Sequence, residues 1–281
     1  MKIAIVVNNL GRGGAERLVV DEVNELTRRE LKVVLITLKP DPVASYSADC
    51  VIPQSDRVFI HFHSLFDIYA WIRLVSYIRR EKPETLVTHL WFSNVIGKIL
   101  VLTRRKIQLI TFEHNVYDKV KTWKQFLADR ILQFVPKHIV AVSNAVKDSL
   151  IKNGIRSSRI VVIENGIDLT RYINASPSRI RNEMDLKDSF IFLSVGRLIP
   201  QKGIDVLLSA FARVPDAHLL IAGEGSERSA LEAQARSLSL ISRVSFLGVR
   251  GDIPSLMKVA DCFVMPSRYE GMPIALIEAL S

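Results

Sequence analysis

A chain of 281 residues is long enough for two ordinary domains, and its 48% hydrophobic and 24% charged residues are typical of a folded globular protein. No apolar stretch reaches the roughly 18 residues that a membrane-spanning helix needs, and two distant cysteines exclude a disulfide framework. The net charge of +9 lies entirely in residues 1–165, with 25 Lys and Arg against 16 Asp and Glu, whereas residues 166–281 hold 13 of each. The first half is therefore expected to meet nucleic acid or a phospholipid surface, unless the excess is only a solvated basic surface.

The first predicted element is a strand at residues 2–7 (KIAIVV). It is not a secretion signal, because the apolar run ends at Asn8 without a small-residue cleavage site. Short apolar or β-branched runs then alternate with helix-like segments through both halves of the chain. These runs lie at 31–38, 85–90, 107–112, 138–143, 159–164, 190–196, 217–223, 243–248 and 261–267. Such alternation predicts parallel sheets covered by helices on both faces.

Residues 165–190 carry turn formers and charge without a strand-like run, which predicts a linker and a lead-in helix. The predicted fold class is α/β, with two doubly wound, Rossmann-like domains that face each other across a cleft. Their predicted ranges are residues 1–165 and 166–281. Ligands of such sheets bind beyond the carboxyl ends of the strands, so the residues after each strand are the candidates for function.

The loop after the first strand contains Gly11, Gly13 and Gly14 (NNLGRGGAER). Glycines let a ligand approach the backbone, and the start of the following helix offers free N–H groups to an anion. The spacing is not that of the dinucleotide fingerprint, and no acidic residue ends the second predicted strand. A nicotinamide dehydrogenase is therefore disfavoured, while a tight structural turn explains the glycines equally well.

The first strand of the second half is followed by VGRLIPQKGID, which places Arg197 and Lys202 between a strand and a helix that begins near Gly203. Two cations beside a helix N-terminus suit a diphosphate and could neutralise it as a leaving group. The chain has no Asp-x-Asp pair to bind a bridging metal. We therefore expect a nucleoside diphosphate to be bound without a metal, although solvated loop side chains are the alternative.

The last twelve residues, EGMPIALIEALS, contain two carboxylates, Glu270 and Glu278. Pro273 suits the first turn of a helix, so Glu270 is expected in the loop at its start and Glu278 more than a turn inside. A carboxylate among apolar neighbours is costly unless something donates hydrogen bonds to it, and a ribose diol offers two such donors. The alternative is that Glu278 faces water on an amphipathic helix.

These segments, with GGAER, TFEHN, VAVSNAVKDSL, IENGID and LIAGEG, resemble the retaining nucleotide-sugar glycosyltransferases of the GT-B fold, family four, group 1. The resemblance implies that Glu278 binds the donor ribose and that Arg197 and Lys202 hold the diphosphate, with Gly13 and Gly14 beside it. Glu270 and His114 match the residues at the transferred sugar and are the candidate catalytic residues. The backbone of Gly271, Met272 and Ile274 is then expected to touch sugar or phosphate.

The function that the resemblance implies is transfer of a hexose or N-acetylhexosamine from a nucleoside diphosphate, with UDP favoured, to a cell-surface polysaccharide or lipid-linked glycan. Retention of configuration without a metal or another cofactor is expected. The alternatives are a nucleotide-sugar epimerase and an inactive glycosyltransferase fragment. A nucleic-acid-binding protein has no recognisable motif behind it. His89 also follows a strand and is a weaker candidate, and His61 and His63 receive no role.

Residues 115–134 are predicted to form a basic helix that lies on an anionic bilayer, with an ordinary surface helix as the alternative. The basic and apolar residues on which this rests are Lys119, Lys121, Lys124, Tyr117, Trp123, Phe126 and Leu127. A cytoplasmic location, peripheral on the inner face of the plasma membrane, is therefore expected. The resembled family continues beyond four strands in its second domain, so we also expect this chain to be C-terminally truncated, with an incomplete second domain.

Overall fold

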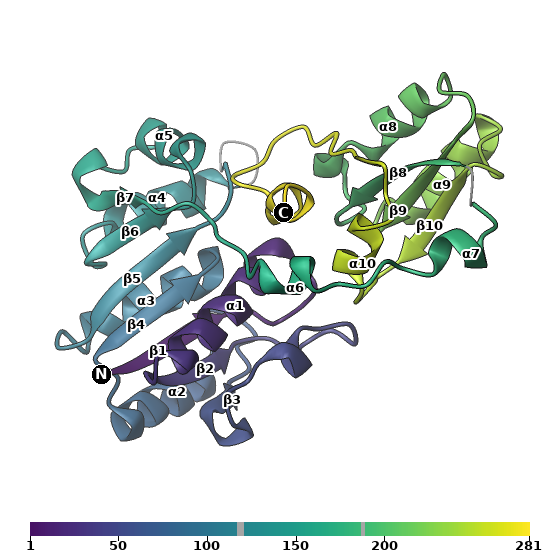
Figure 1. The fold of residues 1–281 in the computed structure, drawn as a ribbon. Coiled ribbons are helices and arrows are strands. Elements are labelled where there is room, and N and C mark those ends of the chain that lie inside the picture. Colours follow the sequence, from purple (N-terminus) through teal and green to yellow (C-terminus); the bar gives the residue numbers. More distant parts are fainter. Residues whose placement is uncertain (117–120, 187–188) are drawn as a thin grey trace. The chain divides into compact units, whose positions relative to one another are not determined.

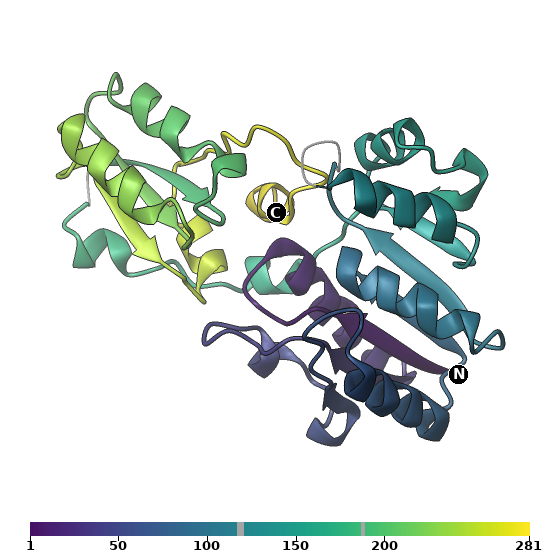
Figure 2. The same cartoon turned by 180° about the vertical axis from the view of Figure 1, so that it is seen from behind.

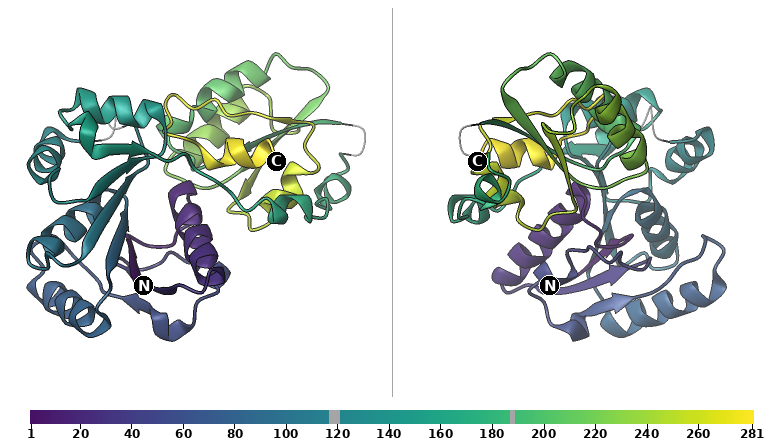
Figure 3. Two further views of the ribbon diagram at one scale, coloured as in Figure 1. Left: turned by 60° about the vertical axis from the view of Figure 1, so that its left-hand side comes forward. Right: turned by 90° about the vertical axis from the view of Figure 1, so that its right-hand side faces the viewer.

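A computed structural model of the chain describes residues 1–116, 121–186 and 189–281. The chain forms two compact units, unit 1 from Met1 to Gly166 and unit 2 from Ile167 to Ser281 (Figure 1). Each unit is built on its own parallel sheet, with helices on both faces, as the views from other sides also show (Figures 2 and 3). The predicted α/β class with two doubly wound sheets is confirmed.

Unit 1 contains a seven-stranded parallel sheet in the order β3-β2-β1-β4-β5-β6-β7. The strands are β1 (Lys2–Val7), β2 (Lys32–Thr37), β3 (Arg57–Phe59), β4 (Thr85–His89), β5 (Gln108–Glu113), β6 (His138–Ala141) and β7 (Ile160–Val162). The chain builds the sheet outward in both directions from β1 and β4. The carboxyl ends of these two strands therefore flank the topological switch point, where sheets of this kind bind ligands.

Alternate residues of the central strands β1, β2 and β4 enter two different cores. Ala4 and Val6 of β1 pack in the core that also holds residues of α2 and α3, whereas Ile3 and Ile5 pack in the core of α1. The helices are α1 (Gly14–Arg28), α2 (Ile68–Glu81), α3 (Trp91–Leu102), α4 (Trp123–Leu132) and α5 (Asn144–Lys152), with short 3-10 turns η1 (Ser47–Asp49), η2 (Gln54–Asp56) and η4 (Ser157–Arg159). Burial on both faces explains why the strands are continuously apolar.

Strand β3 was not expected from the sequence. It has three residues, pairs only with β2 at the edge of the sheet, and is only partly buried, so it lacks the apolar run that marks the other strands. The prediction that His61 and His63 lie in a loop agrees with their position after β3. Short edge strands of this kind carry little sequence signal because neighbouring structure, rather than their own hydrophobicity, holds them.

Unit 2 contains a four-stranded parallel sheet in the order β10-β9-β8-β11. Its strands are β8 (Phe190–Val195), β9 (Ala217–Ala222), β10 (Val244–Gly248) and β11 (Cys262–Phe263), and its helices are α6 (Thr170–Ile173), α7 (Ile180–Glu183), η5 (Pro200–Lys202), α8 (Ile204–Phe211), α9 (Arg228–Ser237), α10 (Ile253–Met257) and α11 (Ile274–Ala279). Residues of α8 and α9 share one core, and residues of α7 and α10 share the other.

The predicted strand at 261–267 is much shorter in the structure. Only Cys262 and Phe263 form β11, although the Val264 N–H still donates to the Leu193 carbonyl. Pro266 has no N–H for the ladder, and β11 pairs with β8 alone. The chain therefore leaves the sheet early, and residues 264–273 form a loop at its carboxyl edge.

Candidate active site

Three loops of unit 2 meet where the neighbouring strands β9, β8 and β11 end, and glycines permit their close contact. Gly203 has φ +66°, and a Cβ at this position would lie 2.3 Å from the Pro266 carbonyl oxygen. Gly223 has φ +146°, and a Cβ there would lie 1.9 Å from the Gly196 carbonyl oxygen. Since neither site tolerates a side chain, the loops after the three strands pack backbone against backbone.

Polar contacts join the loop after β8 to the loop after β11. The Arg268 N–H donates to the Gln201 carbonyl over 2.8 Å, and the Gln201 side chain donates to the Tyr269 carbonyl over 3.0 Å. The Arg268 guanidinium binds both oxygens of Asp205 in the first turn of α8 and thereby lowers the pKa of that carboxyl. These contacts hold Glu270, which lies two positions after Arg268, against Lys202.

The structure brings together two residues that were predicted to have separate roles. Lys202 Nζ donates to Glu270 Oε1 over 2.6 Å, although the residues lie 68 positions apart. Both side chains are partly accessible, at 19% and 17% exposure. Within the described part of the chain, the exposed Arg197 side chain makes no hydrogen bond or ion pair, whereas Lys202 is paired with Glu270.

Glu278 has a partner that sequence reasoning missed. It lies in α11, is half-buried, and accepts a hydrogen bond at Oε1 from the hydroxyl of Tyr172. Tyr172 is buried and belongs to α6, inside the segment predicted to be a linker. No sequence signal could have linked the two, because they are 106 positions apart. Glu278 is therefore not a carboxylate that simply faces water.

Residues 271–274 lie at the end of the loop and the start of a helix, as the sequence predicted. Gly271 and Met272 complete the loop, Pro273 is the N-cap of α11 and not part of its first turn, and Ile274 is the first helical residue and is buried. Their assignment as backbone contacts of sugar or phosphate stays a prediction.

Gly13 and Gly14 lie at the start of α1 in unit 1. Gly13 is the N-cap with an extended backbone, and Gly14 is the first helical residue. A Cβ at Gly13 would meet the flexible end of Glu16, which lies 2.3 Å away. A carboxylate so near the helix N-terminus competes there with any bound anion. The expected role of these glycines at a diphosphate stays a prediction.

His114 and His89 lie together at the carboxyl edge of unit 1. His114 follows β5, His89 ends β4, and His89 Nδ1 lies 3.1 Å from His114 Nε2. Both rings are buried. Burial, with a smaller contribution from the charge of His89, holds the pKa of His114 well below its ordinary value. From the sequence His89 was the weaker candidate. Only the pairing of β4 with β5 reveals the contact between His89 and His114.

The structure corrects the assignment of Lys121 to a membrane-facing surface. Its side chain is only 2% exposed and pairs with Asp129 over 2.7 Å and with Glu113 over 3.3 Å. Asp129 also accepts from the buried Lys98 over 2.9 Å. Lys121 therefore belongs to a buried ion network. It is not on the predicted surface helix, because that helix begins only at Trp123. Tyr117 and Lys119 lie outside the described residues.

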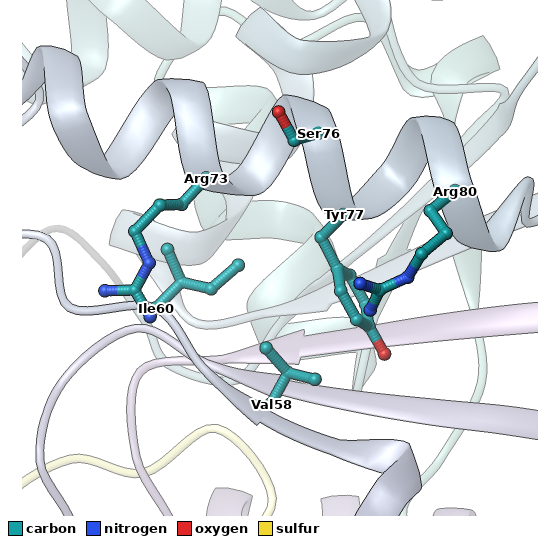
Figure 4. Close-up of a pocket in the computed structure, with 6 residues that line it drawn as sticks. All are labelled: Val58, Ile60, Arg73, Ser76, Tyr77 and Arg80. Atoms are coloured by element: carbon teal, nitrogen blue, oxygen red, sulfur yellow. The ribbon is translucent and has the colours of Figure 1, made fainter.

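A shallow groove of about 280 Å³ lies between α2 and the edge strand β3, and it contains none of the predicted site residues (Figure 4). Its lining is Val58, Ile60, Arg73, Ser76, Tyr77 and Arg80. Burial, together with the nearby Glu81, raises the pKa of Tyr77 to about 12. This groove does not coincide with either set of loop residues that carry the sequence motifs.

The described residues hold neither a metal-binding cluster nor a membrane-spanning helix. They contain no group of three or more His, Cys, Asp or Glu side chains arranged to hold a metal ion. None of their helices is both long and apolar enough to cross a membrane.

Comparison with known proteins identifies both parts of the chain. Residues 12–171 match Glycosyltransferase Family 4, and residues 178–281 match Glycosyl transferases group 1. The chain is 28% identical to the UDP-Gal:alpha-D-GlcNAc-diphosphoundecaprenol alpha-1,3-galactosyltransferase of Escherichia coli, over 95% of this chain and 74% of that protein. It is 27% identical to the lipopolysaccharide core biosynthesis glycosyltransferase LpsE of Rhizobium meliloti, over 95% and 73%. The crystal structure of Anabaena Alr3699/HepE in complex with UDP-glucose has a TM-score of 0.86 at 22% identity, covering 100% of this chain and 78% of that one. The last similarity confirms the predicted GT-B fold class.

Proposed function

The chain belongs to Glycosyltransferase Family 4, and from this premise we propose that it transfers a hexose or N-acetylhexosamine from a nucleoside diphosphate sugar, with UDP as the favoured nucleotide. The proposed acceptor is a cell-surface polysaccharide or a lipid-linked glycan. The E. coli relative carries diphosphoundecaprenol, a lipid diphosphate, in the name of its substrate, which supports an acceptor of this chemistry. No cofactor beyond the nucleotide sugar is proposed.

The observation that carries this proposal is the Lys202–Glu270 pair, with the exposed Arg197 in the loop after β8. The two cations would bind the diphosphate and neutralise the charge that develops on it as the sugar leaves. Lys202 has three N–H donors, so it can keep its bond to Glu270 while it donates to phosphate. Glu270 would thereby be held at the boundary between diphosphate and sugar, with an oxygen for a sugar hydroxyl.

Glu278 is proposed to bind the donor ribose. Tyr172 uses one of its oxygens, Oε1, and fixes the orientation of the carboxylate. The second oxygen can accept from a ribose hydroxyl. Lone pairs that remain on Oε1 can serve the neighbouring hydroxyl. Tyr172 thus becomes part of the proposed nucleotide site.

The proposed reaction retains the anomeric configuration and needs no metal. Arg197 and Lys202 supply the positive charge that a metal would otherwise bring to the diphosphate. No enzyme nucleophile is assigned. The acceptor hydroxyl would attack the face from which the diphosphate leaves, and a phosphate oxygen would take its proton. His114 is proposed to contact the transferred sugar.

Calorimetry of donor binding tests this assignment. Arg197→Ala and Lys202→Ala should each weaken UDP-sugar binding by about 1.5–3 kcal/mol, the range for a hydrogen bond to a charged group. Arg236→Ala, which removes an exposed cation from α9, is the control and should bind normally. Unchanged affinity in both Arg197→Ala and Lys202→Ala would exclude the proposed diphosphate site.

Two carboxamide variants separate the roles of the glutamates. Glu278→Gln should weaken binding of free UDP, because one acceptor oxygen becomes a donor. Glu270→Gln should bind UDP nearly normally and lose turnover. The reverse pattern would mean that the two roles are exchanged. Incubation with donor but without acceptor distinguishes transfer from epimerisation, since an epimerase would convert the donor alone.

The exposed face of α4 supports the proposed peripheral attachment to an anionic membrane, although Lys121 is not part of it. Four apolar side chains at helical spacing are exposed on and just after this helix: Trp123, Leu127, Ile131 and Phe134. Lys124 lies over the Trp123 ring, and Arg156 and Arg159 lie over the Phe134 ring. Apolar side chains flanked by cations suit the interface of an anionic bilayer.

Co-sedimentation with vesicles tests the membrane assignment. The chain should bind phosphatidylglycerol vesicles, release in high salt, and bind phosphatidylcholine vesicles weakly, since screening shortens electrostatic attraction to about 10 Å at 0.1 M. Ile131→Ser should reduce binding, because Ile131 is 65% exposed on this face. Ile241→Ser removes a similar side chain, 67% exposed in unit 2, and is the control. Equal binding to both vesicle types would contradict attachment through charge.

A further inference from the structure

A second charged residue lies behind the histidine pair of unit 1. Glu22 of α1 approaches His89 from the side opposite His114, with 3.0 Å between Glu22 Oε2 and His89 Nε2. The carboxylate lies off the line of the ring N–H, so the contact is electrostatic rather than a well-aligned hydrogen bond. His89 is fully buried between the two, and its Nδ1 lies 3.1 Å from His114 Nε2.

This order of groups restricts where the protons can be. A contact between two ring nitrogens needs one proton, on either His89 Nδ1 or His114 Nε2. The negative charge of Glu22 favours a proton on His89 Nε2, the nitrogen beside it. A neutral His89 with its proton on Nε2 has an acceptor at Nδ1. His114 must then be the donor, through Nε2.

We propose that Glu22 and His89 are positioning residues that hold His114 as the neutral tautomer protonated on Nε2. His114 then offers an unprotonated Nδ1, which is a hydrogen-bond acceptor for a sugar hydroxyl. This inference rests on the proposed function only in naming the sugar as the ligand of His114. The burial that keeps the pKa of His114 low also keeps its ring neutral at physiological pH.

The local structure immobilises this arrangement. His89 pairs in register with Phe112, and their rings stack at 4.6 Å with an angle of 17°. Leu90, which follows His89, has φ +71° and ψ 151°, a conformation that residues other than glycine rarely adopt. Such a backbone persists only when its surroundings determine it, and strain of this kind is found at functional sites.

The neighbouring side chains Thr88, Asn94 and Glu113 have partners of their own. Thr88 donates to Asn94, and Asn94 donates to Glu113 on the α3 side of the sheet. Glu113 also accepts from Lys121. These side chains alternate with His89 and His114 along β4 and β5, so they point to the opposite face. Among the described residues, Glu22, on the α1 side, is thus the carboxylate that lies at ion-pair distance from His89.

Nitrogen NMR of the full chain, labelled on histidine with ¹⁵N, tests the proposal without any substrate. His114 should show one tautomer between pH 6 and pH 8, with Nε2 protonated and Nδ1 not. A His114 protonated on Nδ1, or an even mixture of tautomers, would overturn the proposal. Because no donor is present, this result does not depend on the proposed function.

Glu22→Gln removes the charge and keeps the shape, so it should convert His114 into a mixture of both tautomers. Glu25→Gln makes the same change one turn along α1, at an exposed carboxylate paired with Arg28 and Arg29, and should leave the tautomer unchanged. His218 is a buried histidine of unit 2 beside Ser245, and its signals serve as an internal control. A single unchanged tautomer in Glu22→Gln would overturn the role of Glu22.

His89→Asn places an amide oxygen where Nδ1 lies, so it should retain the His114 tautomer, whereas His89→Leu offers no acceptor and should lose it. Sugar transfer by His89→Leu should fall roughly tenfold, the effect of about one hydrogen bond, and His89→Asn should restore most of it. If His89→Leu does not fold, the Asn variant alone decides, since loss of the tautomer there contradicts the role of His89. Retained tautomers with no sugar transfer in the unaltered chain would contradict the proposed function instead.

Discussion

Charged side chains gather near the carboxyl edges of both sheets, but they differ in burial. In unit 1, Lys98 and Lys121 are each 2% exposed and share Asp129 in a closed network. In unit 2, Lys202 is 19% exposed and pairs with Glu270 at 2.6 Å. The charges of this network in unit 1 therefore neutralise one another, whereas Lys202 of unit 2 remains accessible to a ligand.

The difference has an energetic consequence. A buried ion pair is tolerated only while both charges are present. Removal of one partner leaves the other as an uncompensated buried charge, which destabilises the fold. Burial alone would raise the pKa of Asp129, but its two lysines outweigh this effect and lower it. A partly exposed pair can be opened by water or by a phosphate at small cost. The buried network of unit 1 thus maintains structure, and the Lys202–Glu270 pair of unit 2 suits binding.

Asp129→Asn should produce the largest effect on stability. It leaves Lys98 buried without a counter-charge and should lower the free energy of unfolding of unit 1 by about 3–5 kcal/mol. Urea unfolding followed by tryptophan fluorescence measures this, since the three tryptophans, Trp71, Trp91 and Trp123, all lie in unit 1. Asp205→Asn in unit 2 breaks a pair that is 46% exposed and should cost less than about 1 kcal/mol by circular dichroism. Equal losses would remove the contrast.

Acidification should destabilise both units, but unit 1 more strongly. The pKa of His114 is lowered by burial and then by His89, and the pKa of His218 is lowered by burial and then by Arg243. Below about pH 6.5 the unfolded chain binds protons that these folded histidines do not. The free energy of unfolding therefore decreases as the pH is lowered. The slope is at most about 1.4 kcal/mol per pH unit for each proton.

Melting temperatures between pH 7.5 and pH 5 measure this effect. In His114→Gln, the tryptophan-monitored transition should lose part of its pH dependence, whereas His218→Gln should leave that transition unchanged. An unaltered slope in His114→Gln would contradict the contribution of His114 to the acid sensitivity of unit 1.

Tyr172→Phe should produce the smallest effect. It removes the hydroxyl that donates a hydrogen bond to Glu278. One such bond contributes about 0.5–1.5 kcal/mol, so UDP binding should weaken by up to roughly tenfold. Calorimetry with UDP provides the measurement. Tyr69→Phe changes an exposed tyrosine of unit 1 and should have no effect. If Tyr172→Phe binds UDP more tightly, Tyr172 competes with ribose instead of orienting Glu278.

The strands and motifs were predictable because they depend on neighbouring residues. Apolar runs between amphipathic segments marked every strand of both sheets except β3, whose three edge residues carry no such pattern. The loop segments around Arg197, Lys202 and Glu270 were recognised for the same reason. Lys121 was misplaced because a charged residue beside aromatic ones looks alike in sequence whether it faces water or a buried carboxylate.

The sequence by itself determined which elements form, which loops carry charged and glycine residues, and which family the chain resembles, since all of these are local properties. Only the tertiary structure decided which distant side chains meet. Lys202 and Glu270 meet because β8 and β11 are neighbours, and His89 and His114 meet because β4 and β5 are. Strand order and register bring the ends of distant segments to one edge, and no local pattern encodes that order.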